Sequence, residues 1–129
     1  MCWMAGSETN SHNGSVGVDT IITGTGSDTI LFNVPLGAAN ADSVLDFAPA
    51  FDTMLLENAV FTGLTQGAFL PAGDFVIGAG AADVTDRIIY DSLTGNLFFD
   101  QDGIGAAAQV LFADLATGLA LTSNDFFVV

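Results

Sequence analysis

The chain has 129 residues, of which half are hydrophobic, and its 15 acidic side chains face a single basic one, Arg87, giving a formal net charge of −14. This length is enough for one domain with a modest core, and the apolar content argues against general disorder. The acidity disfavours nucleic acid and anionic membranes as partners, because both are bound through Lys and Arg. Such a surface attracts divalent cations, and it also keeps an apolar chain soluble.

Features that other classes of protein need are missing from the sequence. No stretch approaches the ~20 uninterrupted apolar residues of a membrane-spanning helix, so we expect no membrane insertion. Cys2 is the only cysteine, which excludes a disulfide within the chain. The first residues lack the basic and apolar regions of a secretory signal peptide. We expect residues 1–13 to be a decayed repeat or a disordered start, belonging to the tail of a longer protein or to a truncated copy.

Two nine-residue units follow in tandem, at residues 14–22 and 23–31, and they align without a gap. Both have the pattern small-small-x-Gly-x-Asp-x-Ile-x. Glycine permits a sharp turn through positive φ, and the Asp that follows can direct its carboxylate toward that turn. Carbonyl and carboxylate oxygens are the hard ligands that calcium takes. The last three residues of each unit predict a short strand whose central Ile is buried only when successive coils stack.

A coil made of two such units would stack each turn on the turn that lies two units further along the chain. On this spacing Asp28 stacks between Asn10 and Asp46, which both offer side-chain oxygens. Asp19 is instead followed by Gly37, which offers only a carbonyl. We therefore expect the edge with Asp28 to bind a cation in preference to the other edge. The alternative is that Gly and Asp only form tight turns here, as they do in many all-β proteins.

The rest of the chain shows a period of two and little helical periodicity. Gly95 suits the left-handed position of a bulged loop in a β-hairpin at residues 87–100. The predicted fold class is all-β: a short parallel calcium-binding β-roll over residues 14–47 that continues into a C-terminal antiparallel β-rich cap over residues 48–129. Short strands are expected at residues 40–47, 51–57, 75–77, 87–91, 96–100, 109–113 and 126–129.

Other chemical signals have simpler interpretations. Residues 100–103 resemble an EF-hand loop, but the flanking ligand positions do not fit, so we interpret them as a turn with at most a minor calcium contact. Arg87 is interpreted as a charge balancer for Asp86 or Asp100. An enzyme is disfavoured, because the chain has neither His-Glu-x-x-His nor Gly-x-Ser-x-Gly, and its one histidine, His12, has no partner cluster.

These residues resemble the C-terminal end of RTX, or haemolysin-type calcium-binding, proteins, and in particular the serralysin-type β-roll region. The resemblance rests on the two nonamers, on residues 42–47 and 52–56, on the hairpin at residues 87–103 and on the acidic-then-apolar tail at residues 124–129. It implies secretion from a Gram-negative bacterium by a type I secretion apparatus, which reads an uncleaved C-terminal signal, here at residues 120–129. The protein would then be extracellular.

The same resemblance implies a set of calcium ligands. In this family a turn supplies the carbonyls of its second and fourth positions and its Asp, and the next turn on that edge adds its first and third carbonyls and its Asp. An insertion at residues 35–39 disturbs the step between the two turns. Carried onto this sequence, one site would be formed by Gly24, Gly26, Asp28, Ala41, Ser43 and Asp46. A weaker site would use Ser15, Gly17 and Asp19.

The function expected from the sequence is a calcium-binding module that folds on export, with calcium as its cofactor. One alternative is a surface-adhesion or matrix module that binds extracellular polymers through Tyr90, Phe98 and Phe99. Another is a truncated fragment of a larger RTX enzyme, whose activity would lie upstream.

Overall fold

The computed structural model describes residues 2–4, 11–12, 16–105 and 107–129, and these residues form β-strands, turns and three short 3-10 helices, with no α-helix among them. The expected all-β class is confirmed. The 3-10 helices are η1 (Ala38–Asn40), η2 (Ala72–Asp74) and η3 (Ser123–Asp125). The strands are β1 (Cys2–Met4), β2 (Ser11–His12), β3 (Thr20–Ile22), β4 (Thr29–Phe32), β5 (Asp42–Val44), β6 (Thr53–Leu56), β7 (Ala68–Phe69), β8 (Phe75–Ile77), β9 (Ile88–Tyr90), β10 (Asn96–Phe99), β11 (Val110–Asp114) and β12 (Phe126–Val128).

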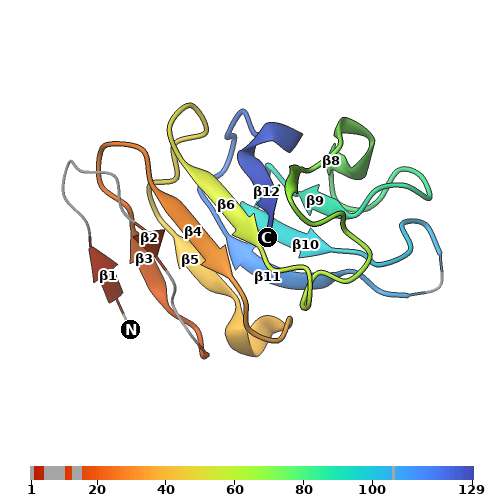
Figure 1. Cartoon of the computed structure of the whole chain (residues 1–129), viewed down its shortest axis with the longest axis horizontal. Coiled ribbons are helices and arrows are strands. Elements are labelled where there is room, and N and C mark those ends of the chain that lie inside the picture. The colour runs from red at the N-terminus through yellow and green to blue at the C-terminus, as the bar shows by residue number, and fades with distance from the viewer. Residues whose placement is uncertain (1, 5–10, 13–15, 106) are drawn as a thin grey trace.

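The strands belong to two sheets, with the orders β1-β3-β5-β11-β10-β9-β8 and β2-β4-β6-β12-β7. From β1 to β6 the chain changes sheet at every turn, and neighbouring strands within each sheet run parallel. Strands β11 and β12 then extend the two sheets by pairing parallel to β5 and β6. Figure 1 shows β1 at one end of the molecule and β8 and β9 toward the other.

The C-terminal cap, which the sequence predicts to be antiparallel, has mixed strand orientation. The hairpin of β9 and β10 and the pair of β10 and β11 are antiparallel, but β8 pairs with β9 in parallel. The segment 78–87 explains this difference, because it crosses back and returns the chain to the end of the sheet where β8 began.

Backbone pairing fixes the spacing between successive coils. Ile21 pairs with Trp3, which precedes it by two repeat lengths, as the nonamers predict. The next step along the chain is longer. Ile21 pairs with Val44, and hydrogen bonds between these two coils join groups 22 to 24 residues apart. In the other sheet Ile30 pairs with Met54, which is also more than two repeat lengths onward. The extra residues lie mainly in the segment between β4 and β5, which contains the insertion noted in the sequence and η1.

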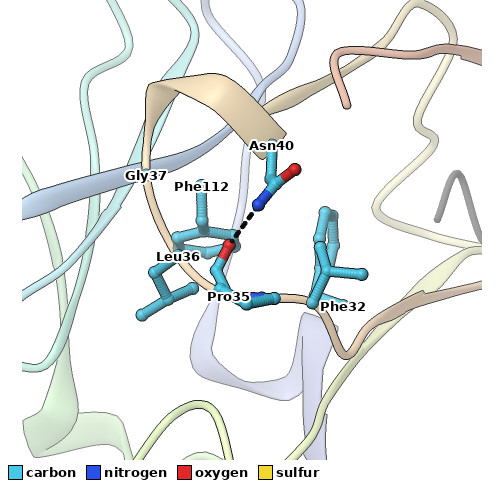
Figure 2. Close-up of a pocket in the computed structure, with 7 residues that line it drawn as sticks. Phe32, Pro35, Leu36, Gly37, Asn40 and Phe112 are labelled. Carbon is cyan, nitrogen blue, oxygen red and sulfur yellow. Dashed lines mark hydrogen bonds between the residues drawn. The ribbon is translucent and has the colours of Figure 1, made fainter. Parts of the chain in front are cut away.

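The inserted segment packs against the core. Leu36 and the rings of Phe32 and Phe112 line a small cavity of about 10 Å³, about the least space that holds one water molecule. Figure 2 shows these three side chains. The side-chain amide of Asn40 donates to the Pro35 carbonyl at 3.0 Å and closes the segment on itself. The longer coil step is therefore supported by its own contacts.

The core lies between the two sheets. Ile21 and Ile30, the central residues of the predicted strands, are fully buried, as expected from the repeats. An aromatic cluster continues this core into the cap, where the ring of Phe61 packs edge-to-face against Phe99 and Phe112 with centroid distances of 5.4 and 4.9 Å. These side chains join the stacked strands and the cap into one hydrophobic cluster.

The β9–β10 hairpin forms as the sequence predicts. Gly95 ends its loop with φ = 86°, in the left-handed region that favours glycine. A Cβ at this position would also collide with the Leu115 carbonyl oxygen, so no larger residue fits without movement of the backbone. The hairpin loop is thus set by both conformation and space.

Candidate metal centre at the stacked turns

The turn that joins β3 to β4, residues 23–28, contains two glycines with positive φ. Gly24 has φ = 78° and Gly26 has φ = 96°, and Gly17, which precedes Asp19 in the equivalent turn, also has φ = 96°. Residues with a side chain rarely adopt these angles. The glycines of the repeat are therefore used for backbone conformation, as the sequence pattern predicts.

On one edge of the molecule Asp28 stacks on Asp52. The backbone N–H of Asp28 donates to Oδ1 of Asp52 at 3.0 Å, and the N–H of Thr53 donates to the Asp28 carbonyl at 2.9 Å. The two Asp residues are only 1 % and 2 % exposed. Two carboxylates from successive coils are thus buried next to each other.

The opposite edge repeats this arrangement with Asp19 and Asp42. The N–H of Asp19 donates to Oδ1 of Asp42 at 2.8 Å, and the N–H of Ser43 donates to the Asp19 carbonyl at 2.8 Å. Both Asp residues are at most 5 % exposed. Each edge of the stacked turns therefore has one buried carboxylate pair.

The electrostatics of both pairs favour a proton or a cation. The pKa of Asp42 is raised to about 6, first because burial disfavours the charged form and also because the Asp19 carboxylate repels it, while the N–H of Asp19 acts in the opposite direction. Burial likewise raises the pKa of Asp52, and with repulsion from the Asp28 carboxylate it outweighs the opposing hydrogen bonds. A bound cation would relieve the repulsion within each pair.

Asp46, a predicted ligand, has a different environment. Its Oδ1 accepts hydrogen bonds from the backbone N–H and from the hydroxyl of Thr23, at 2.7 and 2.9 Å, and its Oδ2 accepts from the N–H of Gly24 at 2.8 Å. Burial alone would raise the pKa of Asp46, but these donors outweigh it and hold the pKa below its usual range. Its carboxylate therefore binds the beginning of the preceding turn.

The structure brings together only part of the predicted six-residue site. Gly24, Gly26 and Asp28 share one turn, and Asp46 contacts the beginning of that turn. Ala41 and Ser43 lie instead on the opposite edge, where Ser43 bonds to Asp19.

The projection of Asp28 onto Asp46, and that of Asp19 onto Gly37, are wrong for a physical reason. The second coil step exceeds two repeat lengths, since its hydrogen bonds span 23 to 24 residues. Asp28 therefore faces Asp52, and Asp19 faces Asp42.

The weaker predicted site lies partly outside the described residues. Ser15 lies outside the described residues, as do Asn10 and most of the expected decayed repeat. The N–H of Gly17 donates to Oδ1 of Asn40 at 2.7 Å, and Asp19 belongs to the pair with Asp42. Gly17 and Asp19 are thus linked to the same neighbouring segment.

Sequence reasoning missed Asp42 and Asp52 as stacking partners, although a signal was present. Asp19 and Asp28 are each followed by Thr-Ile at the start of a strand. Asp42 is followed by Ser-Val and Asp52 by Thr-Met, at the start of β5 and β6. The combination of Asp, a small hydroxyl residue and a buried apolar residue therefore marks the start of all four strands from β3 to β6, even where the nine-residue spacing is lost.

A hollow of about 410 Å³ lies between the two turns of the Asp28 edge. Among the described residues no three His, Cys, Asp or Glu side chains converge in a group that could hold a metal. A cation at this edge would thus need backbone carbonyls, such as those of Gly24 and Gly26, besides the carboxylates of Asp28 and Asp52. The hollow is lined by Gly24, Thr25, Gly26, Ser27, Ala48 and Phe51.

The cap contains a second set of acidic residues, around Arg87. Nη1 of Arg87 donates to the carbonyls of Val84 and Asp86, at 2.7 and 3.0 Å. In the loop at residues 100–103, the N–H of Asp102 donates to Oδ1 of Asp100 at 3.2 Å, which fits its interpretation as a turn. These contacts organise two loops of the cap.

Comparison with protein-family models and with curated proteins finds no match for this chain. In the part of the chain that the structure describes, no helix has the length and apolar character needed to cross a membrane. The resemblance to RTX proteins therefore rests on sequence patterns alone, namely the two nonamers, residues 42–47 and 52–56, the hairpin at residues 87–103 and the tail at residues 124–129.

Proposed function

We propose that this protein is a calcium-binding module in which the stacked turns form a short β-roll of the RTX type. The observation that supports the proposal most is the pair of buried carboxylates on each edge, Asp28 with Asp52 and Asp19 with Asp42. Each pair joins successive coils at the position where the repeat places its acidic residue. The glycine-rich turns beside them carry backbone carbonyl oxygens, which would complete the kind of ligand set that calcium prefers.

Calcium fits these ligands better than other common metals. Zinc and copper favour nitrogen and sulfur ligands, whereas the stacked turns offer carboxylates, carbonyls and hydroxyls. Magnesium requires near-ideal octahedral geometry and keeps several waters, while calcium accepts six to eight oxygens in flexible arrangements. Ligands supplied by two separate turns suit calcium.

Calcium binding would couple to folding through charge. Two carboxylates ~4 Å apart repel by about 4 kcal/mol at an effective dielectric of 20. An ion that binds only the folded state stabilises it by about 2.7 kcal/mol per site at a hundredfold excess over the dissociation constant. Low cytosolic calcium would then leave the stacked turns less stable and more often open, and the higher extracellular concentration would stabilise the folded state after export.

Secretion by a type I apparatus is part of the same proposal. The expected signal, residues 120–129, includes β12, which pairs with β6 and β7 and has Phe126 and Val128 buried. An apparatus that reads this segment would have to bind it before the sheets close. A folded state that is less stable without calcium would keep the signal accessible during export.

The test of calcium binding is isothermal titration of the purified chain, combined with circular dichroism in calcium and in chelator. We expect binding in the 10⁻⁴ to 10⁻³ M range that is typical of extracellular modules. Asp28→Asn and Asp52→Asn should each weaken binding, and the cap variant Asp91→Asn should not. Unchanged spectra and melting temperature, with no heat of binding, would refute the proposal.

The polymer-binding alternative receives less support from the described residues. Tyr90 is fully buried and Phe99 is buried in the aromatic cluster, so only Phe98 of the three aromatics is partly exposed. The alternative of a fragment from a larger RTX enzyme would use the same calcium site. We propose no catalytic role for this chain.

A further inference from the structure

The carboxylate of Asp46 is held by three donors from one short segment of the preceding coil. The consecutive N–H groups of Thr23 and Gly24 and the Thr23 hydroxyl all donate to it, at 2.7 to 2.9 Å. Consecutive N–H groups at a residue with positive φ form a concave anion-binding arrangement, called a nest. Here the anion is a side chain of the same protein.

We propose that Asp46 is a positioning residue of the calcium site, which fixes the turn carrying Gly24 and Gly26 without itself binding the ion. The proposal rests on the proposed calcium function. Three of the roughly four acceptor positions of this carboxylate are used by protein donors, whereas Asp52 accepts from two backbone N–H groups, so fewer positions remain for a cation at Asp46. The place opposite Asp28 is also taken by Asp52, which lies 24 residues onward.

The three hydrogen bonds to Asp46, which we call the anchor, act on the turn through a rigid peptide unit. The N–H of Gly24 belongs to the planar peptide that joins it to Thr23, so a hydrogen bond to this N–H fixes the orientation of the whole plane. The glycine carbonyls follow immediately in the chain. Because Gly24 and Gly26 have no side chains to restrict them, their carbonyl directions depend on such external contacts.

Thr23 extends this anchor toward the carboxylate pair. Its side chain is fully buried, and its hydroxyl lies 2.9 Å from Oδ1 of Asp46 and 3.4 Å from Oδ2 of Asp52. A hydroxyl has one proton to donate, and the shorter distance assigns that proton to Asp46. Thr23 therefore places the anchored end of the turn beside Asp52, the stacking partner of Asp28.

The first experiment measures amide hydrogen exchange in chelator, so that no cation is involved. In Asp46→Asn the amides of Thr23 and Gly24 should exchange at least about tenfold faster, because charge-assisted hydrogen bonds are roughly twice as strong as neutral ones. The matched control is Asp91→Asn, whose carboxylate accepts one local N–H, from Leu93. Unchanged exchange of both amides in Asp46→Asn would overturn the anchor.

The second experiment separates positioning from direct ligation. Terbium replaces calcium, and its luminescence lifetimes in H₂O and D₂O count the waters bound to the ion. Loss of a ligand admits water, so Asp28→Asn should add bound water. Asp46→Asn should leave the water count unchanged and weaken binding about five- to tenfold, because a mobile turn must be ordered when the ion binds. An added water in Asp46→Asn would show that Asp46 is a ligand and would overturn the proposal.

Two further outcomes remain decisive. If Asp46→Asn does not fold, Thr23→Val removes only the hydroxyl donor, and it should raise exchange at the same two amides while Thr23→Ser restores the wild-type rates. Wild-type rates in Thr23→Val would then contradict the anchor. If the wild-type protein binds neither ion, the calcium function fails, and the chelator experiment alone decides whether Asp46 holds the turn.

Discussion

Buried carboxylates have different partners in the two halves of this protein. In the stacked-turn region, residues 16–56, Asp42, Asp46 and Asp52 accept hydrogen bonds from backbone N–H groups that lie 22 to 24 residues away. In the C-terminal region, residues 57–129, Asp86 and Asp125 accept from N–H groups only 3 to 4 residues away. Aspartate thus joins two coils in one half, where Asp52 also closes its own loop through the N–H of Ala48, and it closes single loops in the other half.

This difference determines where like charges meet. A carboxylate that bonds to the next coil is brought close to the acidic residue of that coil, as in the pair of Asp19 and Asp42. A carboxylate that closes its own loop, such as that of Asp125 over Thr122, needs no charged partner. Like charges also meet in the cap, where burial and the Asp102 carboxylate raise the pKa of Asp100, but those two residues belong to one loop. Dependence on cations should therefore be largest in the stacked-turn region. The following substitutions test this separation.

The largest effect is expected for Asp52→Ala, with Asp86→Ala as its matched partner in the other half. Each residue is buried and accepts two backbone N–H groups, from Asp28 and Ala48 in one case and from Ala82 and Asp83 in the other. Each substitution should lower the free energy of unfolding by about 3 kcal/mol, because a buried donor without an acceptor costs about 1–3 kcal/mol.

Calcium should distinguish these two variants. Chemical denaturation with and without calcium should show that Asp86→Ala keeps the calcium-dependent stabilisation and that Asp52→Ala loses much of it. An equal calcium response in both variants would remove the proposed difference between the halves.

Removal of calcium from the wild-type protein should have the next largest effect. At a hundredfold excess over the dissociation constant, one site contributes about 2.7 kcal/mol to stability. Amide exchange should show that calcium slows the exchange of the N–H groups of Asp19, Asp28 and Thr53, where the coils meet. The hairpin amides of Asp91 and Gly95 should change less. A uniform change along the chain would indicate that the two halves open together.

The pH dependence of stability tests the pair of Asp19 and Asp42. Because the pKa of Asp42 is raised to about 6 in the folded protein, above its unfolded value of 3.8, the folded state binds more protons between these values. In chelator, stability should therefore rise as the pH falls from 6 to 4, by up to about 1.4 kcal/mol per pH unit for one proton. The rise should be smaller in Asp42→Asn, measured by urea unfolding at each pH.

Calcium should suppress this pH effect, because the ion competes with the proton for the same carboxylates. The comparison with Asp42→Asn is needed, since burial also raises the pKa of Asp74 and Asp125 in the C-terminal region. If wild type and Asp42→Asn had the same pH profile in chelator, the pair would not be the source of the dependence.

The local parts of this architecture could be predicted from the sequence. The strands around Ile21 and Ile30 follow from the repeat, and the hairpin follows from alternating apolar residues on both sides of a turn with Gly95. In the candidate site, Gly24, Gly26 and Asp28 share a turn because they are neighbours in the chain. Such features depend on a few adjacent residues.

The pairing between coils could not be predicted from a fixed repeat length. The second step is set by contacts between distant residues, such as Phe32 with Phe112, whose rings pack edge-to-face at 5.3 Å and support the inserted segment. Counting two repeat lengths onward from Asp28 therefore gives Asp46, whereas Asp52 is the residue that stacks on Asp28. The parallel pairing of β11 with β5 has the same origin, because the two strands are far apart in the chain.

The smallest predicted effect is that of Tyr90→Phe in the C-terminal region. The Tyr90 hydroxyl donates to the Ala116 carbonyl and accepts from the N–H of Leu119, so it ties the loop after β11 to the β9 strand. Its removal should cost about 1 kcal/mol of stability, the usual contribution of such hydrogen bonds, since the ring stays in the core. Denaturation curves in calcium and in chelator should shift by the same amount. A shift that depends on calcium would mean that the ion's influence reaches the cap, because nothing in this hydrogen-bonded contact involves a carboxylate.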